Sequence, residues 1–438
     1  MHSLKVNKSF VHKIATAASV LTLLALSACG QSAEQTATPV TETANAEPVT
    51  VVFYEGARLI VGDGSEPIEN SVFSVDSGHF VAVGTAGELT IPEGATRIDL
   101  SGMTVMPTII DTHTHLSVTR EALLDDLQRR AYFGVSATLS MGADGPGAPL
   151  EMRDEVIPDA ALYQSAGHGI TAPEPGRRVV HWVTNEEEAR QAVQTEAARN
   201  VDVIKLWVDD RDGQFEQLSP EIYGAAIDEA HQNNIRVSSH QYELVDAKGL
   251  VRAGVDIFAH GVRDQDIDDE FVDMVKQRPN LVLIPNLPER GVPTDLDWLT
   301  GSIPDAVLNG LQENNTDNPE AQEMFNIQAR NLARLSDEGM TITVGTDGNR
   351  PWGPHIEMED MVASGMTPAQ VLVAATKNGA ALMELDDRGT IEVAKVADFI
   401  VLAANPLDDI NNTRKISTVY LSGKEVDRAG ISARWNDL

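Results

Sequence analysis

The stretch Met106-Pro107-Thr108-Ile109-Ile110-Asp111-Thr112-His113-Thr114-His115-Leu116 ends an apolar run in a His-X-His pair. In a β-strand the side chains of residues i and i+2 point to the same side, so the imidazoles of His113 and His115 would face one way at the strand end. Two neutral imidazoles held side by side suit a divalent transition metal. Such pairs also arise by chance, so the interpretation depends on residues further along the chain.

Four further segments combine an apolar run with a residue that can bind metal, and helix-like sequence separates them. Residues 200–208 contain Lys205, residues 235–240 end in His240, residues 255–261 contain His260, and residues 340–348 contain Asp347. In a (β/α)8 barrel the carboxyl ends of the strands converge on one mouth, where such barrels keep their chemistry. Six side chains from five strands could therefore meet at one metal centre.

On these residues the chain resembles the amidohydrolase superfamily of metal-dependent hydrolases. It is most similar to the branch that contains prolidase-like and N-acyl-amino-acid-cleaving enzymes. The similarity spans roughly residues 50 to 430 and includes residues 389–402, which look like the closing sandwich strands of the family. The family usually has glycine where Thr108 and Ala394 stand, but both departures fall in turns and not at ligands.

The resemblance implies a binuclear centre with two divalent metal ions. Zinc is the metal we expect, although mixed histidine and carboxylate sites also accept manganese, iron or nickel. A buried lysine in an apolar strand is costly if it is charged and unpaired. The resemblance implies that Lys205 is carbamylated and bridges the metals, and the alternative is a salt bridge to Asp209, Asp210 or Glu243. The expected ligands are His113, His115, Lys205, His240, His260 and Asp347.

The chemistry implied is hydrolysis of an amide bond in a dipeptide or N-acyl amino acid, by a metal-bridging hydroxide with Asp347 as general base. His168 could contact the substrate carbonyl or support a loop, and Tyr242 could stabilise the oxyanion or pack on the barrel rim. His355 could belong to the site or cap or pack a helix. One of four arginines in loops could grip a substrate carboxylate: Arg177, Arg178, Arg263 or Arg350.

Two other functions remain open. The segment His240-Gln241-Tyr242-Glu243 resembles the His-X-X-Glu of mononuclear deaminases and cyclic-amide hydrolases, in which Glu243 would shuttle protons and Lys205 would stay unmodified. The chain could also be a non-catalytic binding lipoprotein that keeps a barrel as a scaffold. Loss of a ligand would be the sign of such a protein, and no ligand is missing from the sequence.

The first 28 residues have the features of a secretory signal, with three lysines followed by the apolar run Ile14 to Ala28. Leu26-Ser27-Ala28-Cys29 resembles a bacterial lipobox, which implies lipidation of Cys29 and, with Gly30 next, sorting to the outer membrane of a Gram-negative cell. The alternative is an ordinary signal peptide with an incidental cysteine. Cys29 is the only cysteine, so disulfides cannot stabilise the fold. Residues 29–49 lack large apolar side chains and are expected to form a flexible tether.

The rest of the chain divides by its periodicity. Residues 50–105 and 386–438 alternate apolar and polar positions in short runs, which predicts one small β-sandwich built from both ends of the chain. Residues 106–385 alternate strand-like and helix-like segments, which predicts a TIM-like (β/α)8 barrel of the α/β class. The 66 acidic residues against 33 basic ones disfavour nucleic acid and anionic lipid. The expected partner is a small-molecule substrate, with membrane contact only through the lipid anchor and a homo-oligomer left open.

Overall fold

The computed structural model describes residues 51–436 apart from residues 154 and 178. The predicted signal segment 1–28, Cys29 and the tether 29–49 lie outside these residues. Within the described part, no helix is both long enough and apolar enough to cross a membrane.

Two sheets with parallel strand pairs carry the residues of interest. One has the strand order β7-β8-β9, and the other has the order β11-β10-β12-β13-β14-β15-β16. Their strands are β7 (Ile109–Thr114), β8 (Val135–Ser140), β9 (Leu162–Ser165), β10 (Ile170–Thr171), β11 (His181–Trp182), β12 (Ile204–Trp207), β13 (Val237–His240), β14 (Ile257–Ala259), β15 (Val282–Ile284) and β16 (Thr341–Ile342).

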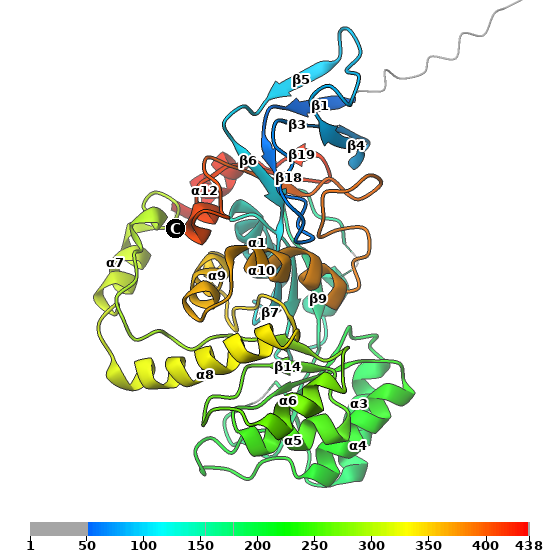
Figure 1. The fold of residues 1–438 in the computed structure, drawn as a ribbon. Coiled ribbons are helices and arrows are strands. Elements are labelled where there is room, and N and C mark those ends of the chain that lie inside the picture. Colours follow the sequence, from blue (N-terminus) through cyan, green and yellow to red (C-terminus); the bar gives the residue numbers. More distant parts are fainter. Residues whose placement is uncertain (1–50, 154, 178, 437–438) are drawn as a thin grey trace, which may run out of the picture. The chain divides into compact units, whose positions relative to one another are not determined.

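Helices connect most of the parallel strands, because parallel neighbours need a crossover connection. Figure 1 shows α3 to α6 lying next to one another against the second parallel sheet. The helices are α1 (Arg120–Tyr132), α2 (Ala148–Met152), α3 (Glu186–Ala197), α4 (Pro220–Gln232), α5 (Leu244–Ala253), α6 (Asp269–Lys276), α7 (Asp305–Glu313), α8 (Pro319–Asp337), α9 (Gly353–Ala363), α10 (Pro368–Val373), α11 (Gly379–Leu382) and α12 (Arg428–Asn436), with short helical turns η1 (Asp297–Leu299), η2 (Ala374–Asn378) and η3 (Ile410–Arg414).

The ends of these helices follow local sequence signals. The side chains of Asn185 and Asp268 each accept a hydrogen bond from the backbone N–H three residues on, which caps the first turns of α3 and α6. Thr367 and Gln370 form a reciprocal capping box at the start of α10. Gly254 ends α5 with a left-handed backbone (φ +102°), a conformation that costs glycine little.

Backbone hydrogen bonds join the two parallel sheets at both margins. Thr112 N donates to Val344 O at 2.9 Å, next to β16, and Asp202 N donates to Ser165 O at 3.0 Å, between β9 and β12. These contacts bring the carboxyl ends of β7 and β16 together. The paired strands themselves do not form one continuous closed ladder.

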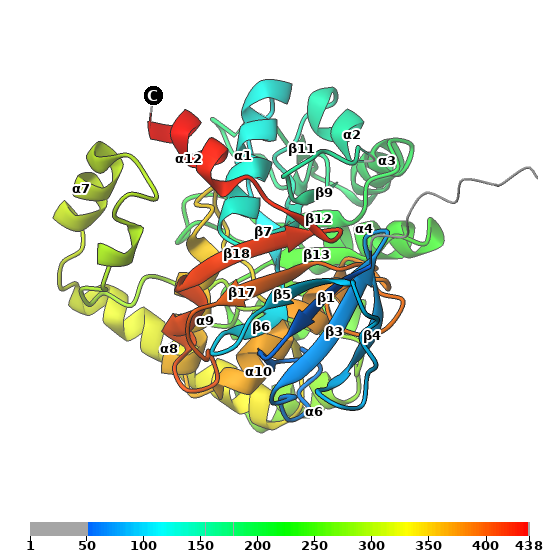
Figure 2. The ribbon, with the colours of Figure 1, turned by 90° about the horizontal axis from the view of Figure 1, so that it is seen from above.

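Two mixed sheets come from the two ends of the described chain, and Figure 2 shows their strands near one another. One has the order β4-β3-β1-β5 and the other the order β19-β18-β17-β6-β2. The aromatic rings of Tyr54, Phe73, Phe399 and Tyr420 pack in one cluster with ring centroids 4.4–5.5 Å apart. The strands are β1 (Val52–Glu55), β2 (Arg58–Leu59), β3 (Ser71–Asp76), β4 (His79–Thr85), β5 (Thr96–Asp99), β6 (Thr104–Pro107), β17 (Phe399–Leu402), β18 (Ile416–Leu421) and β19 (Lys424–Glu425).

The predicted α/β class is confirmed. One strand boundary differs from the one that the sequence suggested. The apolar run that begins at Met106 is not one strand, because Met106 and Pro107 end β6 in a mixed sheet and Ile109 starts β7 in a parallel sheet. Thr108 is the joint between them, since its N–H bonds to Asp398 O while the N–H of Ile109 bonds to Gly134 O. The two sheets therefore meet one residue before the strand that carries the His-X-His pair.

Candidate metal centre

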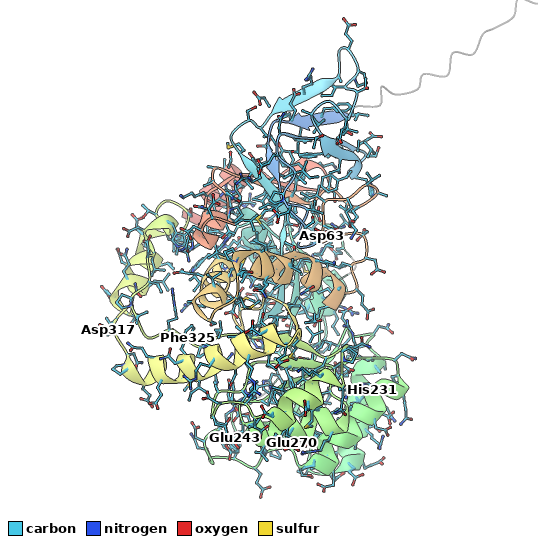
Figure 3. The ribbon with its side chains drawn as sticks, viewed as in Figure 1. Asp63, His231, Glu243, Glu270, Asp317 and Phe325 are labelled. Carbon is cyan, nitrogen blue, oxygen red and sulfur yellow. The ribbon has the colours of Figure 1, made fainter. Side chains whose placement is uncertain are left out.

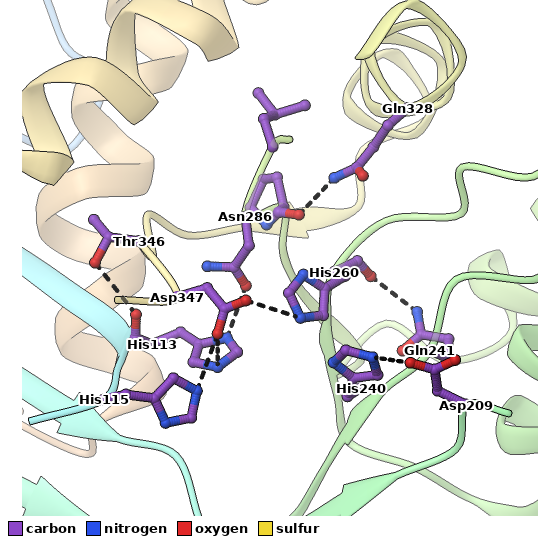
Figure 4. Close-up of polar contacts among 12 residues, drawn as sticks. His113, His115, Asp209, His240, Gln241, His260, Asn286, Gln328, Thr346 and Asp347 are labelled. Atoms are coloured by element: carbon purple, nitrogen blue, oxygen red, sulfur yellow. Dashed lines mark hydrogen bonds and ion pairs between the residues drawn. The ribbon is translucent and has the colours of Figure 1, made fainter. Parts of the chain in front are cut away.

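His113, His115 and Asp347 form a compact group at the end of β7, with their ligand atoms within 4.8 Å of one another. Asp347 Oδ1 lies 3.2 Å from His113 Nε2 and 3.0 Å from His115 Nε2 (Figure 4). The turn after β16 brings Asp347 there, because the backbone N–H groups of Thr346 and Asp347 both donate to His113 O at 2.9 Å. Asp347 takes a left-handed backbone in this turn (φ +50°).

His260 and His240 extend the group from β14 and β13. His260 Nε2 lies 3.5 Å from Asp347 Oδ2, and its ring centroid is 5.5 Å from that of His113 and 4.6 Å from that of His240. His260 has a positive φ of 117°, which is rare for a residue with a side chain and is found mainly at functional sites. His240 Nε2 lies 3.0 Å from Asp209 Oδ2.

Lys205 lies on β12 and is fully buried, and its Nζ has no hydrogen-bond partner among the described residues. Burial lowers the pKa of its ammonium group to about 7, and its charge in turn depresses the pKa of both His113 and His240. The salt bridge considered from the sequence is absent in this part of the chain. Asp209, one of the three proposed partners, contacts Arg211 and His240 instead.

The donor set fits divalent metal ions. Burial lowers the pKa of His113 to about 4 and the pKa values of His240 and His260 well below the usual range, so these imidazoles are neutral donors. Several buried donor atoms have no hydrogen-bond partner in the described structure: His113 Nε2, His115 Nδ1, both ring nitrogens of His260, and Lys205 Nζ. Two of them, His113 Nε2 and His260 Nε2, face the carboxylate of Asp347 at 3.2 and 3.5 Å, as is expected where a cation binds.

Three polar residues outside the expected ligand set contact the ligands or the turn beside them. Asn286 Oδ1 lies 2.8 Å from His113 Nδ1, and Asp209 contacts His240. Asp111 accepts hydrogen bonds from His113 N and Thr346 Oγ1. Only the position of Asn286, directly after the apolar run that forms β15, could have suggested its role.

The secondary candidates lie in different places. Tyr242 packs on His240 and His260, with ring centroids 4.4 and 5.1 Å apart. His168 lies instead in a second group with His181 and Glu196, where Glu196 already accepts hydrogen bonds from His181 and Arg199.

His355 and Glu243 make no hydrogen bond or ion pair to the six expected ligands in the part of the chain that is described. His355 is buried in α9 and contacts Thr413 Oγ1 and Phe133 O. Of the roles considered for His355, these contacts agree with packing of a helix. Glu243 is exposed at the start of α5, where Figure 3 labels it.

A cavity of about 530 Å³ lies beside His240, lined by Tyr242, Arg263 and many carboxylates. The Arg263 guanidinium lies 3.2 Å from the centroid of the Tyr242 ring. Arg177 and Arg211 both contact Glu174. Arg350 is exposed, and Arg178 lies outside the described residues.

The chain is similar to known proteins over most of its length. The family model described as "Amidohydrolase family" matches residues 104–426. The chain is 26% identical to ochratoxinase from Aspergillus niger over 460 aligned residues, which cover 90% of each chain. It is similar to the structure of a putative prolidase from Bifidobacterium longum, at 26% identity and a TM-score of 0.72, over 89% of this chain and 99% of that one. A Xaa-Pro dipeptidase with bound methionine shares the fold, at 20% identity and a TM-score of 0.69, over 86% and 99% of the two chains.

The family match covers most of the chain and includes every strand that carries an expected ligand. The alignments span 90% of ochratoxinase and 99% of the prolidase structure, so the match is not confined to one motif. The chain belongs to the amidohydrolase family, in its prolidase-like branch, and is a metal-dependent hydrolase that acts on carbon–nitrogen bonds.

Proposed function

We propose that this chain is a binuclear amidohydrolase that cleaves the amide bond of a dipeptide or an N-acyl amino acid. The observation that carries the binuclear form is Lys205, which is buried on β12 and whose Nζ has no hydrogen-bond partner among the described residues, with only the ring of Trp207 at 5.6 Å. Its strand pairs directly with β13, which carries His240. A carbamate resolves this cost: the lysine ammonium first loses one proton, its nitrogen bonds to the carbon of carbon dioxide, and a second proton leaves, so a cation becomes an anion with two oxygen ligands. His113, His115 and Asp347 would hold one side of the centre, and His240 and His260 the other.

The residues of the chain then divide the work. Two divalent metal ions bound here would make water nucleophilic near neutral pH and polarise the scissile carbonyl. Asp347 would take the proton of the attacking water and deliver it to the leaving amine nitrogen, so that the amine departs neutral. Tyr242 would donate its hydroxyl hydrogen to the carbonyl oxygen as negative charge develops there, and its ring contacts with His240 and His260 support this role.

Among the four arginines considered from the sequence, Arg263 is favoured for binding a substrate carboxylate. Its guanidinium lines the cavity and makes no ion pair in the described part of the chain. Arg177 is already paired with Glu174, Arg350 is exposed, and Arg178 lies outside the described residues. A planar guanidinium binds a carboxylate through two parallel hydrogen bonds. Both substrate classes proposed here end in a free carboxylate.

We also propose the finer architecture. One buried apolar cluster contains Ile110 of β7, Leu139 of β8, Ile257 of β14 and Ile284 of β15. Side chains from strands on both parallel sheets meet there, which supports a (β/α)8 barrel whose interior they fill. The aromatic cluster shared by the two mixed sheets supports a small β-sandwich. The domain limits 50–105, 106–385 and 386–438 stay predictions, as do export through residues 1–28 and lipid anchoring through Cys29.

The mononuclear alternative has less support. It needs Glu243 beside the metal as a proton shuttle, yet Glu243 is exposed and makes no hydrogen bond or ion pair with a ligand among the described residues. A binding lipoprotein without catalysis is also less favoured, because all six expected ligand side chains are present and five of them lie on or beside strand ends at one site.

Elemental metal analysis of the full-length chain, with native mass measured in bicarbonate, tests the binuclear proposal. We expect about two metal ions per chain and the added mass of one carbon dioxide. Lys205→Ala should lose that mass and bind about one metal ion or fewer, and a small carboxylate should partly restore binding. The control is Lys276→Ala, an exposed lysine that pairs with Glu338.

One metal ion per wild-type chain, with Lys205→Ala fully active, would move the assignment to the mononuclear enzyme. If the chain binds no metal ion even after attempted reloading, the non-catalytic binding protein becomes the favoured alternative.

A further inference from the structure

We propose that Asn286 is a positioning residue that fixes the tautomer and the ring orientation of His113. Asn286 lies two residues after β15 and is 4% exposed. Its Oδ1 is 2.8 Å from His113 Nδ1 (Figure 4). A carbonyl oxygen only accepts, so Nδ1 carries the hydrogen and the lone pair is on Nε2.

The hydrogen bond from His113 to Asn286 matters because it leaves the lone pair of His113 Nε2 pointing toward Asp347. His113 Nε2 lies 3.2 Å from Asp347 Oδ1 and is buried without a hydrogen-bond partner in the described structure. With hydrogen on Nδ1, a lone pair and a carboxylate oxygen face each other across this distance, and both are acceptors. A cation between them relieves the repulsion. Asn286 therefore prepares His113 as a ligand before any metal ion binds.

The surrounding structure holds Asn286 from two sides. The N–H of the next residue, Leu287, donates to both carboxyl oxygens of Glu357 on α9, at 3.1 and 3.2 Å. Gly345 lies on the other side, where a Cβ would be 2.8 Å from His113 Cβ and 3.0 Å from Asn286 Nδ2. Only glycine allows Asn286 and His113 to come this close.

The backbone of Asn286 also favours this residue type. Its φ is +44°, in the left-handed region that asparagine tolerates better than most residues with a side chain. The conformation turns the amide toward β7 immediately after β15 ends. Asparagine is therefore suited both to the backbone and to the hydrogen bond, and aspartate is the nearest substitute for both.

The inference rests on the proposed metal site, and it is tested by the zinc affinity of the full-length chain, measured by competition with a chromophoric chelator. Asn286→Ala should weaken zinc binding by about 10- to 100-fold, the usual cost of losing a residue that orients a metal-binding histidine. Asn286→Asp, which still accepts from Nδ1, should bind zinc within a few-fold of the wild type. The control is Asn378→Ala, whose amide bonds to Ile342 O and touches no ligand.

Each outcome decides a different question. Equal zinc affinity of Asn286→Ala and the wild type overturns the positioning role. Weak zinc binding by a folded Asn286→Asp variant also overturns it, because a carboxylate accepts from Nδ1 as the amide oxygen does. If Asn286→Ala does not fold, Asn286→Asp decides alone. A wild-type chain that binds no zinc contradicts the metal site itself and not the role of Asn286.

Discussion

Asp347 is the residue on which the proposed proton transfer depends. It lies within 3.5 Å of three imidazoles, and its φ of +50° is a conformation that asparagine also adopts readily. Asp347→Asn should therefore keep the fold and much of the bound metal, but lower turnover by about 10²- to 10⁴-fold because the amide cannot accept a proton. Circular dichroism, metal content and kcat measured on the same preparation separate these effects.

A matched control is Asp317→Asn, an exposed aspartate before α8 that Figure 3 labels. It should leave all three measurements unchanged. Near-normal turnover of Asp347→Asn would remove Asp347 as the general base. Loss of the folded state would show that Asp347 is needed for structure instead.

At this same scale the sequence predicted which side chains lie together at the candidate site better than it predicted the residues that contact them. His113 and His260 stand at the ends of apolar runs, where periodicity alone places a side chain at the strand end. The role of Asn286 depends on a left-handed backbone and on the close approach that Gly345 permits, and neither has a signature in a single sequence. His168 also follows a strand, but Glu196 and His181 lie beside it, and only the folded chain shows this.

Two glycines in the middle of neighbouring helices make a test at the scale of the element. A Cβ added at Gly224 of α4 would meet nothing within 4 Å, whereas one added at Gly249 of α5 would lie 2.3 Å from the hydroxyl of the buried Tyr223. Gly224→Ala should raise the free energy of unfolding by about 0.5–1 kcal/mol, because alanine loses less backbone entropy. Gly249→Ala should instead lower it, by about 1–3 kcal/mol, through overpacking.

Chemical denaturation of both variants under the same conditions checks the pair. If both variants gain the same free energy of unfolding, Tyr223 moves aside without cost. If both variants lose the same free energy of unfolding, the helix propensity at Gly224 of α4 does not limit the stability of the protein.

Element boundaries depended on partners that the sequence could not name. The periodicity of residues 106–116 is continuous, but Pro107 lacks an N–H and Thr108 bonds to Asp398, so the run divides between a mixed and a parallel sheet. The alternation of strands and helices from residue 106 onward was readable because each crossover helix has its own apolar face. Pairing between sheets depends on long-range contacts, which local patterns do not encode.

The whole molecule carries a formal net charge of −33, and the cavity beside the metal ligands shares this character. The cavity is lined by seven carboxylates and only two arginines, of which Arg211 is already paired. Burial raises the pKa of Asp246 to about 6, with the nearby charge of Glu243 as a second cause, which shows how closely these carboxylates lie. The field at the mouth should therefore repel a second negative charge on a substrate.

Two dipeptides that differ only in glutamine against glutamate measure this repulsion, because their shapes are nearly equal. At low salt we expect kcat/KM to favour the glutamine form by roughly tenfold or more, since like charges oppose both encounter and binding. Raising the salt from about 0.01 M to 1 M shortens the screening length from about 30 Å to about 3 Å and should narrow the ratio. A ratio that does not change with salt would place the discrimination in direct contacts, and a preference for glutamate would mean that Arg263 sets the field at the site.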